Sequence, residues 1–161
     1  MSSTKGKTLY FNNKSMDYVT FGKGKKPLLI IPGLGDGLAT VKRMAQMLAL
    51  AYRDFATAYQ VYVFSRINEL PENYSTRDMA TDIAEAMEVL GLKTVAVLGI
   101  SQGGMVAQWL AADFSERVEK LILTVTTAKL NNLGRERITR WLELSQTGAY
   151  KELMLDIASH S

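Results

Sequence analysis

Ser101 stands in the pattern Gly-x-Ser-x-Gly, formed by residues 99–103, with an apolar run before it and an amphipathic segment after it. A serine flanked in this way can be a nucleophile for acyl chemistry if it occupies a sharp turn between a strand and a helix. Such a turn strains the serine backbone and lifts its hydroxyl clear of the sheet, so strand and helix approach closely. Gly99 and Gly103 would remove the clashes of that approach. The pattern therefore predicts that Ser101 is a nucleophile.

A nucleophilic serine also needs donors for the negative charge that develops on the substrate oxygen. The backbone N–H of Gln102 would be one donor, because it opens the helix that follows Ser101. The glycine-rich stretch IIPGLGDG, residues 30–37, follows the first buried strand and would supply a second donor. Two plainer readings stay open at this point. Ser101 could simply cap a helix, and the glycines could form a flexible connection.

Six segments are expected to form the sheet that positions these loops. Two alternating runs separated by Lys14-Ser15 read as an antiparallel hairpin, whereas four later runs (PLLII, VYVFS, VAVLG and LILTV) are continuously apolar and read as parallel strands buried on both faces. Helical patterns between these runs indicate an α/β fold with helices on both faces. We predict strands near 7–13, 16–22, 27–32, 60–65, 94–99 and 119–126. Their predicted spatial order, 1-2-4-3-5-6, rests on this run pattern together with the family resemblance described below.

Three helices are expected between the buried strands. The first runs from about Leu38 to Tyr52, and the second starts with Ser75 or Thr76 as N-cap and stops at Gly91. The third follows Ser101. Its inward residues are predicted to be Met105, Val106, Trp109 and Leu110. From Lys129 onward the chain is more polar, with two helical stretches near 135–146 and 149–159.

The amino-acid composition indicates a globular protein and excludes several kinds of partner and site. The 161 residues are 47% hydrophobic and 22% charged, which suits one globular domain with a substantial core. The net charge of +3 is spread along the chain, so no nucleic-acid partner is expected. Lys23, Lys25 and Lys26 read as a solvated hairpin turn. The absence of cysteine excludes disulfides and thiolate metal sites, and no stretch reads as a signal peptide or membrane span. We expect a cytoplasmic protein without membrane partner, cofactor or metal.

At these residues the chain resembles the α/β-hydrolase superfamily. The segments LLIIPGLGDG, YQVYVFSRINELPENYSTRDMATDIAEAMEVLGL and VAVLGISQGGMVAQWLAADFSERVEKLIL carry the resemblance, which covers about residues 8–128. By position it implies that Ser101 is the nucleophile and that the backbone N–H groups of Leu34 and Gln102 form the oxyanion hole. Gly33 and Gly35 belong to the oxyanion loop. Pro32 stands where the family often has histidine.

The acid and base of a catalytic triad are not evident in this sequence. A serine hydroxyl needs a base that is oriented by a third group, and the family order is Ser, then Asp or Glu, then His. His160 is the only histidine and reads as an exposed terminal residue. Lys129 is the alternative candidate for the base. We therefore expect a partial α/β-hydrolase core in residues 1–128, lacking the C-terminal strands, and the start of a helical lid in 129–161.

Three functions are compatible with this pattern. The first is a serine hydrolase that acts on a small ester, thioester, lactone or similar acyl substrate, with its acid and histidine outside these residues. The second is a non-catalytic binding module, and the third is a haloperoxidase-like or C–C hydrolase activity that uses the same serine. A fold does not separate them. Self-association through the strand at 119–126 is also expected, because no later strand of this sequence would pair with it.

Overall fold

The computed structural model describes residues 4, 6–37 and 39–159. The chain forms two compact units, residues 1–127 and 128–161. The first unit contains the sheet and the elements that carry the candidate site. The second contains two helices. In the described part of the chain no helix is both long enough and apolar enough to cross a lipid bilayer.

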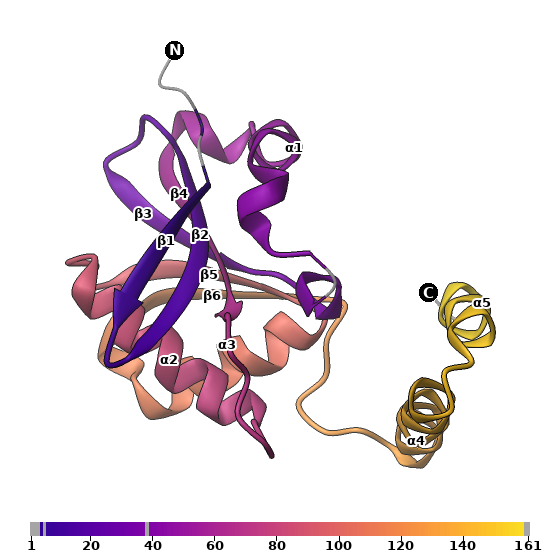
Figure 1. The fold of residues 1–161 in the computed structure, drawn as a ribbon. Coiled ribbons are helices and arrows are strands. Elements are labelled where there is room, and N and C mark those ends of the chain that lie inside the picture. Colours follow the sequence, from indigo (N-terminus) through magenta and orange to yellow (C-terminus); the bar gives the residue numbers. More distant parts are fainter. Residues whose placement is uncertain (1–3, 5, 38, 160–161) are drawn as a thin grey trace. The chain divides into compact units, whose positions relative to one another are not determined.

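The first unit is built on a six-stranded sheet in the predicted order β1-β2-β4-β3-β5-β6 (Figure 1). The first two strands are antiparallel to each other, β2 is antiparallel to β4, and the four later strands are parallel. The placement of β4 outside β3 is confirmed. The strands are β1 (Gly6–Phe11), β2 (Lys14–Gly22), β3 (Lys26–Ile31), β4 (Tyr59–Ile67), β5 (Val95–Ile100) and β6 (Val118–Thr124).

Helices cover both faces of this sheet. Figure 1 shows α1 on one face and α2 and α3 on the other. The α-helices of this unit are α1 (Ala45–Ala51), α2 (Thr76–Val89) and α3 (Gln102–Asp113), and short 3-10 turns occupy η1 (Leu34–Gly37), η2 (Val41–Met44), η3 (Phe55–Thr57) and η4 (Ser115–Arg117). The predicted cap of α2 is confirmed, because Ser75 and Asp78 form a reciprocal capping box.

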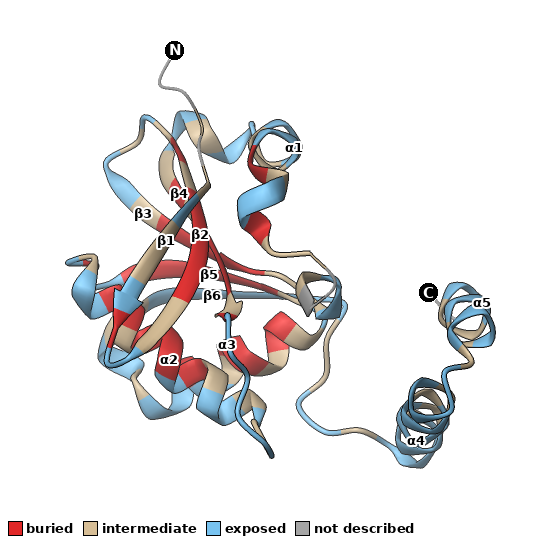
Figure 2. Cartoon of the chain, in the orientation of Figure 1, coloured by how far each residue is buried: buried red, intermediate tan, exposed pale blue. Residues whose placement is uncertain are grey.

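The central strands are buried on both faces, as their continuous apolar runs predict (Figure 2). Successive residues of one strand point to opposite faces, so each strand contributes to two cores. One core packs against α2 and α3 and includes Leu29, Ile31, Val95 and Val97. The other packs against η2 and α1 and includes Leu28, Ile30, Ala96 and Leu98.

The hairpin turn between β1 and β2 differs from the prediction. Asn12 and Asn13, and not Lys14-Ser15, form the turn, with φ angles of 46° and 60°. Lys14 is already in β2, where it pairs with Phe11. Asparagine tolerates positive φ better than most residues, and a two-residue turn with positive φ at both positions matches the twist of a hairpin.

The lysine-rich connection between β2 and β3 is exposed as predicted, but it is not a hairpin turn. Both strands pair with β4, one on each side of it, so the connection passes the start of β4 instead of joining neighbours. Gly24 makes this crossing possible. A Cβ at Gly24 would lie 2.1 Å from the carbonyl oxygen of Ala58.

Two helix predictions need correction. Leu38 lies outside the described residues, and the helical stretch becomes α-helical only at Ala45 after the 3-10 turn η2. In α3, Trp109 is 40% exposed and Met105 is only partly buried. Val106 and Leu110 are buried as predicted. The other buried residues of α3 are the small Gly103, Gly104 and Ala107, which lie where the helix is most closely packed. The Trp109 ring instead lies under the Arg77 guanidinium, 4.9 Å from it.

The strand β6 is not buried on both faces, contrary to the prediction for LILTV. Leu121, Ile122 and Leu123 are between 38% and 44% exposed. In the described residues β6 pairs only with β5, so it forms one edge of the sheet. Its outer edge has no paired strand among the described residues, and its apolar side chains stay partly exposed.

The second unit consists of α4 (Asn132–Gln146) and α5 (Tyr150–Ala158). Asn131 caps α4 by accepting a hydrogen bond of 2.8 Å from the N–H of Gly134. Gly148, with φ of 74°, lies in the turn between the helices. The indole N–H of Trp141 donates to the Asp156 carboxylate at 2.7 Å and joins the two helices.

Candidate active site

Ser101 occupies a sharp turn between β5 and α3. Its φ of 55° and ψ of −121° lie far from the regions that residues with a Cβ normally adopt. Two backbone hydrogen bonds hold this turn. The N–H of Ser101 donates to the carbonyl of Thr124 at 3.0 Å, and the N–H of Gly104 donates to the carbonyl of Ser101 at 2.9 Å. The Ser101 side chain is left exposed at the carboxyl edge of the sheet.

The two glycines of the motif are required by close packing. A Cβ at Gly99 would lie 2.7 Å from the Cβ of Ala107, and one at Gly103 would lie 2.1 Å from the carbonyl oxygen of Ile31. Neither distance is possible for a real Cβ. Gly104 is equally constrained, because a Cβ there would lie 2.5 Å from the side chain of Thr126. The strand and helix thus approach each other as closely as the motif predicts.

The glycine-rich loop after β3 lies against Ser101. A Cβ at Gly33 would be 3.1 Å from the Cβ of Ser101 and 3.6 Å from its Oγ. Leu34, which is 54% exposed, opens the turn η1 at this point. The two segments that the sequence assigned to an oxyanion hole are therefore neighbours. Gly35 differs, because a Cβ there would meet nothing within 4 Å.

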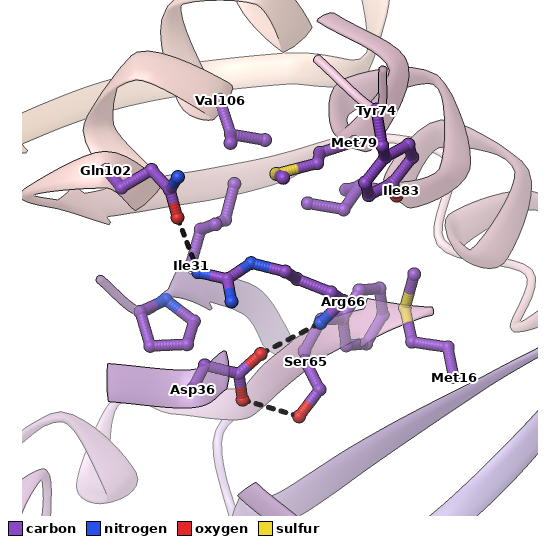
Figure 3. Close-up of a pocket in the computed structure, with 12 residues that line it drawn as sticks. Met16, Ile31, Asp36, Ser65, Arg66, Tyr74, Met79, Ile83, Gln102 and Val106 are labelled. Carbon is purple, nitrogen blue, oxygen red and sulfur yellow. Dashed lines mark hydrogen bonds between the residues drawn. The ribbon is translucent and has the colours of Figure 1, made fainter. Parts of the chain in front are cut away.

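A polar network at the end of β4 connects these two segments, and the sequence analysis missed it (Figure 3). The Asp36 carboxylate accepts hydrogen bonds from the hydroxyl of Ser65 at 2.7 Å and from the N–H of Arg66 at 2.9 Å. The Arg66 guanidinium donates to the side-chain oxygen of Gln102. The available signal was a polar Ser-Arg pair that follows directly after the buried run of β4.

A small pocket surrounds the Arg66 side chain between the sheet and helices α2 and α3. Figure 3 shows Arg66 extended across it toward Gln102. Most of the lining is apolar. The apolar side chains come from Met16, Ile31, Pro32, Phe64, Met79, Ile83 and Val106. Tyr74 also lines it, and burial together with its hydrogen bond to Asp82 raises the pKa of the Tyr74 hydroxyl.

The structure places no candidate base beside Ser101 in the part of the chain it describes. No side chain there forms a hydrogen bond with Ser101 Oγ. His160 lies outside the described residues, and Lys129 belongs to the second unit. The described site therefore comprises the exposed serine, the two backbone segments beside it and the network that joins them.

Comparison with known proteins assigns this arrangement to a family. The family model described as alpha/beta hydrolase fold matches residues 26–147. The chain is 29% identical over 125 residues to 3-oxoadipate enol-lactonase 2 of Acinetobacter baylyi, covering 76% of this chain and 46% of that protein. It is also 29% identical over 142 residues to Serine hydrolase BPHL of Mus musculus, covering 82% of this chain and 48% of the relative.

A solved structure, a hydrolase from Pseudomonas aeruginosa PA01, is similar with a TM-score of 0.69 and 26% identity. That match covers 89% of this chain and 56% of the solved chain. The chain thus spans about half the length of these relatives. The family match includes β3 to β6, the glycine-rich loop and the serine turn, and it confirms the resemblance seen in the motifs. The chain belongs to the alpha/beta hydrolase fold family.

Proposed function

We propose that Ser101 is the nucleophile of a serine hydrolase that acts on a small ester, lactone, thioester or similar acyl substrate. The observation that carries the proposal is the strained turn of Ser101, with φ of 55°, set directly against Gly33. A helix cap alone would not need a positive φ or glycines on both flanks. The glycine contacts at Gly33, Gly99 and Gly103 support the same reading.

In this proposal the Ser101 hydroxyl attacks the carbonyl carbon of the substrate while a base accepts its proton. The carbonyl oxygen becomes negative and takes hydrogen bonds from the backbone N–H groups of Leu34 and Gln102. As the intermediate collapses, the base gives this proton to the leaving alcohol or thiol, and an acyl group stays on Ser101. Water then attacks the acyl group, which releases the carboxylic acid and restores the serine hydroxyl. The acid and the histidine that assist these steps come from outside the described residues.

The relatives favour an acyl substrate. One of them is named an enol-lactonase and another a serine hydrolase. A lactone and an open-chain ester are attacked at the same type of carbonyl carbon, so both fall within the proposal. The haloperoxidase-like and C–C hydrolase alternatives would use the same serine, and substrate profiling separates them from ester hydrolysis.

A non-catalytic binding module is the second candidate. It is favoured by the lack of any hydrogen-bond partner for Ser101 Oγ among the described residues. Without a base the hydroxyl keeps its proton at neutral pH and attacks poorly. In this case the site would bind an acyl compound at the two backbone segments without cleaving it.

Hydrolysis of p-nitrophenyl acetate and butyrate tests the proposal. Two proteins are assayed side by side: the product of the complete reading frame, which in this proposal includes the acid and the histidine, and the 161-residue chain. We expect the former to be active and Ser101→Ala to lower its kcat by at least about 10³-fold, because triad serines contribute this much or more. The 161-residue chain should show at most trace turnover. Ser115→Ala, at an exposed serine of η4, is the matched control and should leave kcat unchanged.

Three outcomes decide between the candidates. Equal activity of the complete protein with and without Ser101→Ala would contradict the proposal. Binding of an acyl compound without turnover in any form would favour the binding module. Robust turnover by the 161-residue chain that disappears with both Ser101→Ala and His160→Ala would identify His160 as the base.

A further inference from the structure

We propose that Ser65 and Arg66, at the carboxyl end of β4, set the spacing between the two halves of the oxyanion hole, with Arg66 as a positioning residue. The inference rests on the proposed role of Ser101 and goes beyond it, because it assigns a role to a strand end that holds neither the proposed nucleophile nor a proposed oxyanion-hole donor. These two neighbouring residues contact both segments that flank Ser101. We call this set of contacts the β4 clamp.

The first arm of the β4 clamp holds the loop that carries Leu34. Asp36 lies two residues later in the same 3-10 turn, and both of its carboxylate oxygens accept hydrogen bonds from the end of β4. The Ser65 hydroxyl also accepts from the N–H of Val41 at 3.0 Å. Ser65 is only 3% exposed, so water competes little for these bonds. The loop is thereby tied to β4 in its middle and at its end.

The second arm holds the first residue of α3. The Arg66 guanidinium donates a hydrogen bond to the side-chain oxygen of Gln102 (Figure 3). Gln102 carries the backbone N–H that directly follows Ser101. Fixing its side chain restricts rotation of that first helical turn, so the direction of the N–H is defined relative to β4. The backbone N–H groups of Leu34 and Gln102 are thus both held in position by contacts with the same strand, β4.

The charge of Arg66 points to an anion that forms beside it. In the part of the chain that the structure describes, Arg66 has no ion-pair partner. Its neutral partner, Gln102, begins a helix whose N-terminus is already positive, which is an unfavourable place for a cation. The Arg66 cation beside this helix N-terminus costs stability in the free protein. It becomes favourable when the oxygen of the tetrahedral intermediate turns negative next to Gln102.

A binding site for a substrate carboxylate is the other use that a cation could have here. The surroundings favour the positioning role, because the guanidinium is directed at Gln102 and the pocket around it is small. Its walls are mostly apolar, with Ile31, Phe64 and Val106 among them. The β4 clamp should therefore affect the rate of the chemical step for neutral and anionic esters alike.

The test uses steady-state kinetics of the product of the complete reading frame with p-nitrophenyl acetate and p-nitrophenyl hydrogen succinate, one neutral and one anionic ester. Arg66→Met should lower kcat for both by about 10- to 100-fold with KM nearly unchanged, because a donor displaced by about 1 Å loses such a factor. Arg66→Lys should recover part of the loss, because it keeps the charge. Arg77→Met is the matched control. Arg77 is an exposed arginine of α2 that pairs with Asp113, and its substitution should leave kcat unchanged.

Hydrogen exchange of the Leu34 and Gln102 amides, measured on the same variants, reports on the β4 clamp independently of turnover. We expect faster exchange of Gln102 in Arg66→Met and faster exchange of Leu34 in Asp36→Asn. Unchanged kcat, or a lowered melting temperature as the sole effect, would overturn the proposal. A raised KM for the anionic ester alone would overturn it in favour of a carboxylate site. Full activity of Ser101→Ala would instead refute the proposed function, and the exchange rates would still decide whether the clamp orders the two segments.

Discussion

Ser101 holds a backbone conformation that opposes the stability of the fold. A residue with a Cβ at φ of 55° and ψ of −121° is strained by about 1–3 kcal/mol. The strain persists because backbone hydrogen bonds to Thr124 and from Gly104 hold the turn. The close packing around the two flanking glycines keeps the strand and helix in place on either side of it. Strain of this kind is common where a side chain must be presented to a substrate.

Replacing this serine with glycine should therefore stabilise the 161-residue chain. We expect Ser101→Gly to raise the free energy of unfolding by about 1 kcal/mol, since glycine adopts this conformation without a steric penalty but gains entropy in the unfolded state. Urea unfolding followed by circular dichroism measures the change. Ser115→Gly, at an exposed serine with negative φ, should not stabilise the chain. A loss of stability in Ser101→Gly would show that the turn is not strained.

At the scale of elements, Asp17 joins the β1–β2 hairpin to the loop that ends at η2. Thr8 donates to one carboxylate oxygen at 2.6 Å and Thr40 to the other at 2.8 Å. Burial alone would raise the pKa of the Asp17 carboxyl, but these hydrogen bonds and the charge of Lys42 outweigh it. The pKa of Asp17 therefore lies below its ordinary value of 3.8.

This lowered pKa makes part of the stability depend on pH. The folded state favours the ionised form, so the contribution is complete above the unfolded pKa and disappears as the pH falls from 3.8 through the folded pKa. Asp17→Asn should lower the free energy of unfolding by about 1–3 kcal/mol at neutral pH. Urea unfolding across a pH series should show this difference shrinking in acid. Asp54→Asn, at a carboxylate that is 94% exposed, is the control and should change stability little at any pH. A constant difference at all pH values would contradict the assignment.

For the whole molecule, the edge strand β6 presents a run of partly exposed apolar side chains. Leu121, Ile122 and Leu123 are each more than a third exposed, and in the described residues β6 pairs with β5 alone. An edge of this kind presents unpaired N–H and C=O groups together with apolar side chains. It can pair with a strand of another chain.

The isolated 161-residue chain is accordingly predicted to self-associate or to be poorly soluble, unless residues 129–161 cover β6. Ile122→Lys should shift the chain toward monomer in sedimentation velocity, because a charge on an edge strand opposes pairing. Leu50→Lys, at an exposed leucine of α1, is the control and should not change the association state. A monodisperse monomer whose β6 amides exchange freely with solvent would contradict the prediction.

Local patterns were enough to predict the strands, the cap of α2 and the position of the serine turn. The order of the strands was predicted from these patterns together with the resemblance to the α/β-hydrolase superfamily. Continuous apolar runs identified β3, β4 and β5 as strands buried on both faces, although the same reading was wrong for β6. Alternation identified the hairpin, because side chains in a strand alternate between faces. The glycines around Ser101 are equally readable, since their steric role depends on the immediate chain geometry. These features depend on residues close in sequence.

The β4 clamp and the face of α3 were decided by the tertiary structure alone. The β4 clamp joins three separate segments through Asp36, Arg66 and Gln102. No local sequence pattern predicts that the polar atoms of these residues form hydrogen bonds. Trp109 was predicted to face inward by its apolar character, but it is 40% exposed, whereas Val106 and Leu110 are buried as predicted. The close contacts at Gly99, Gly103 and Gly104 decide which face of α3 is buried. Because the interior is close-packed, which side chains fit at a position depends on neighbours from distant segments. Those neighbours are known only from the tertiary structure.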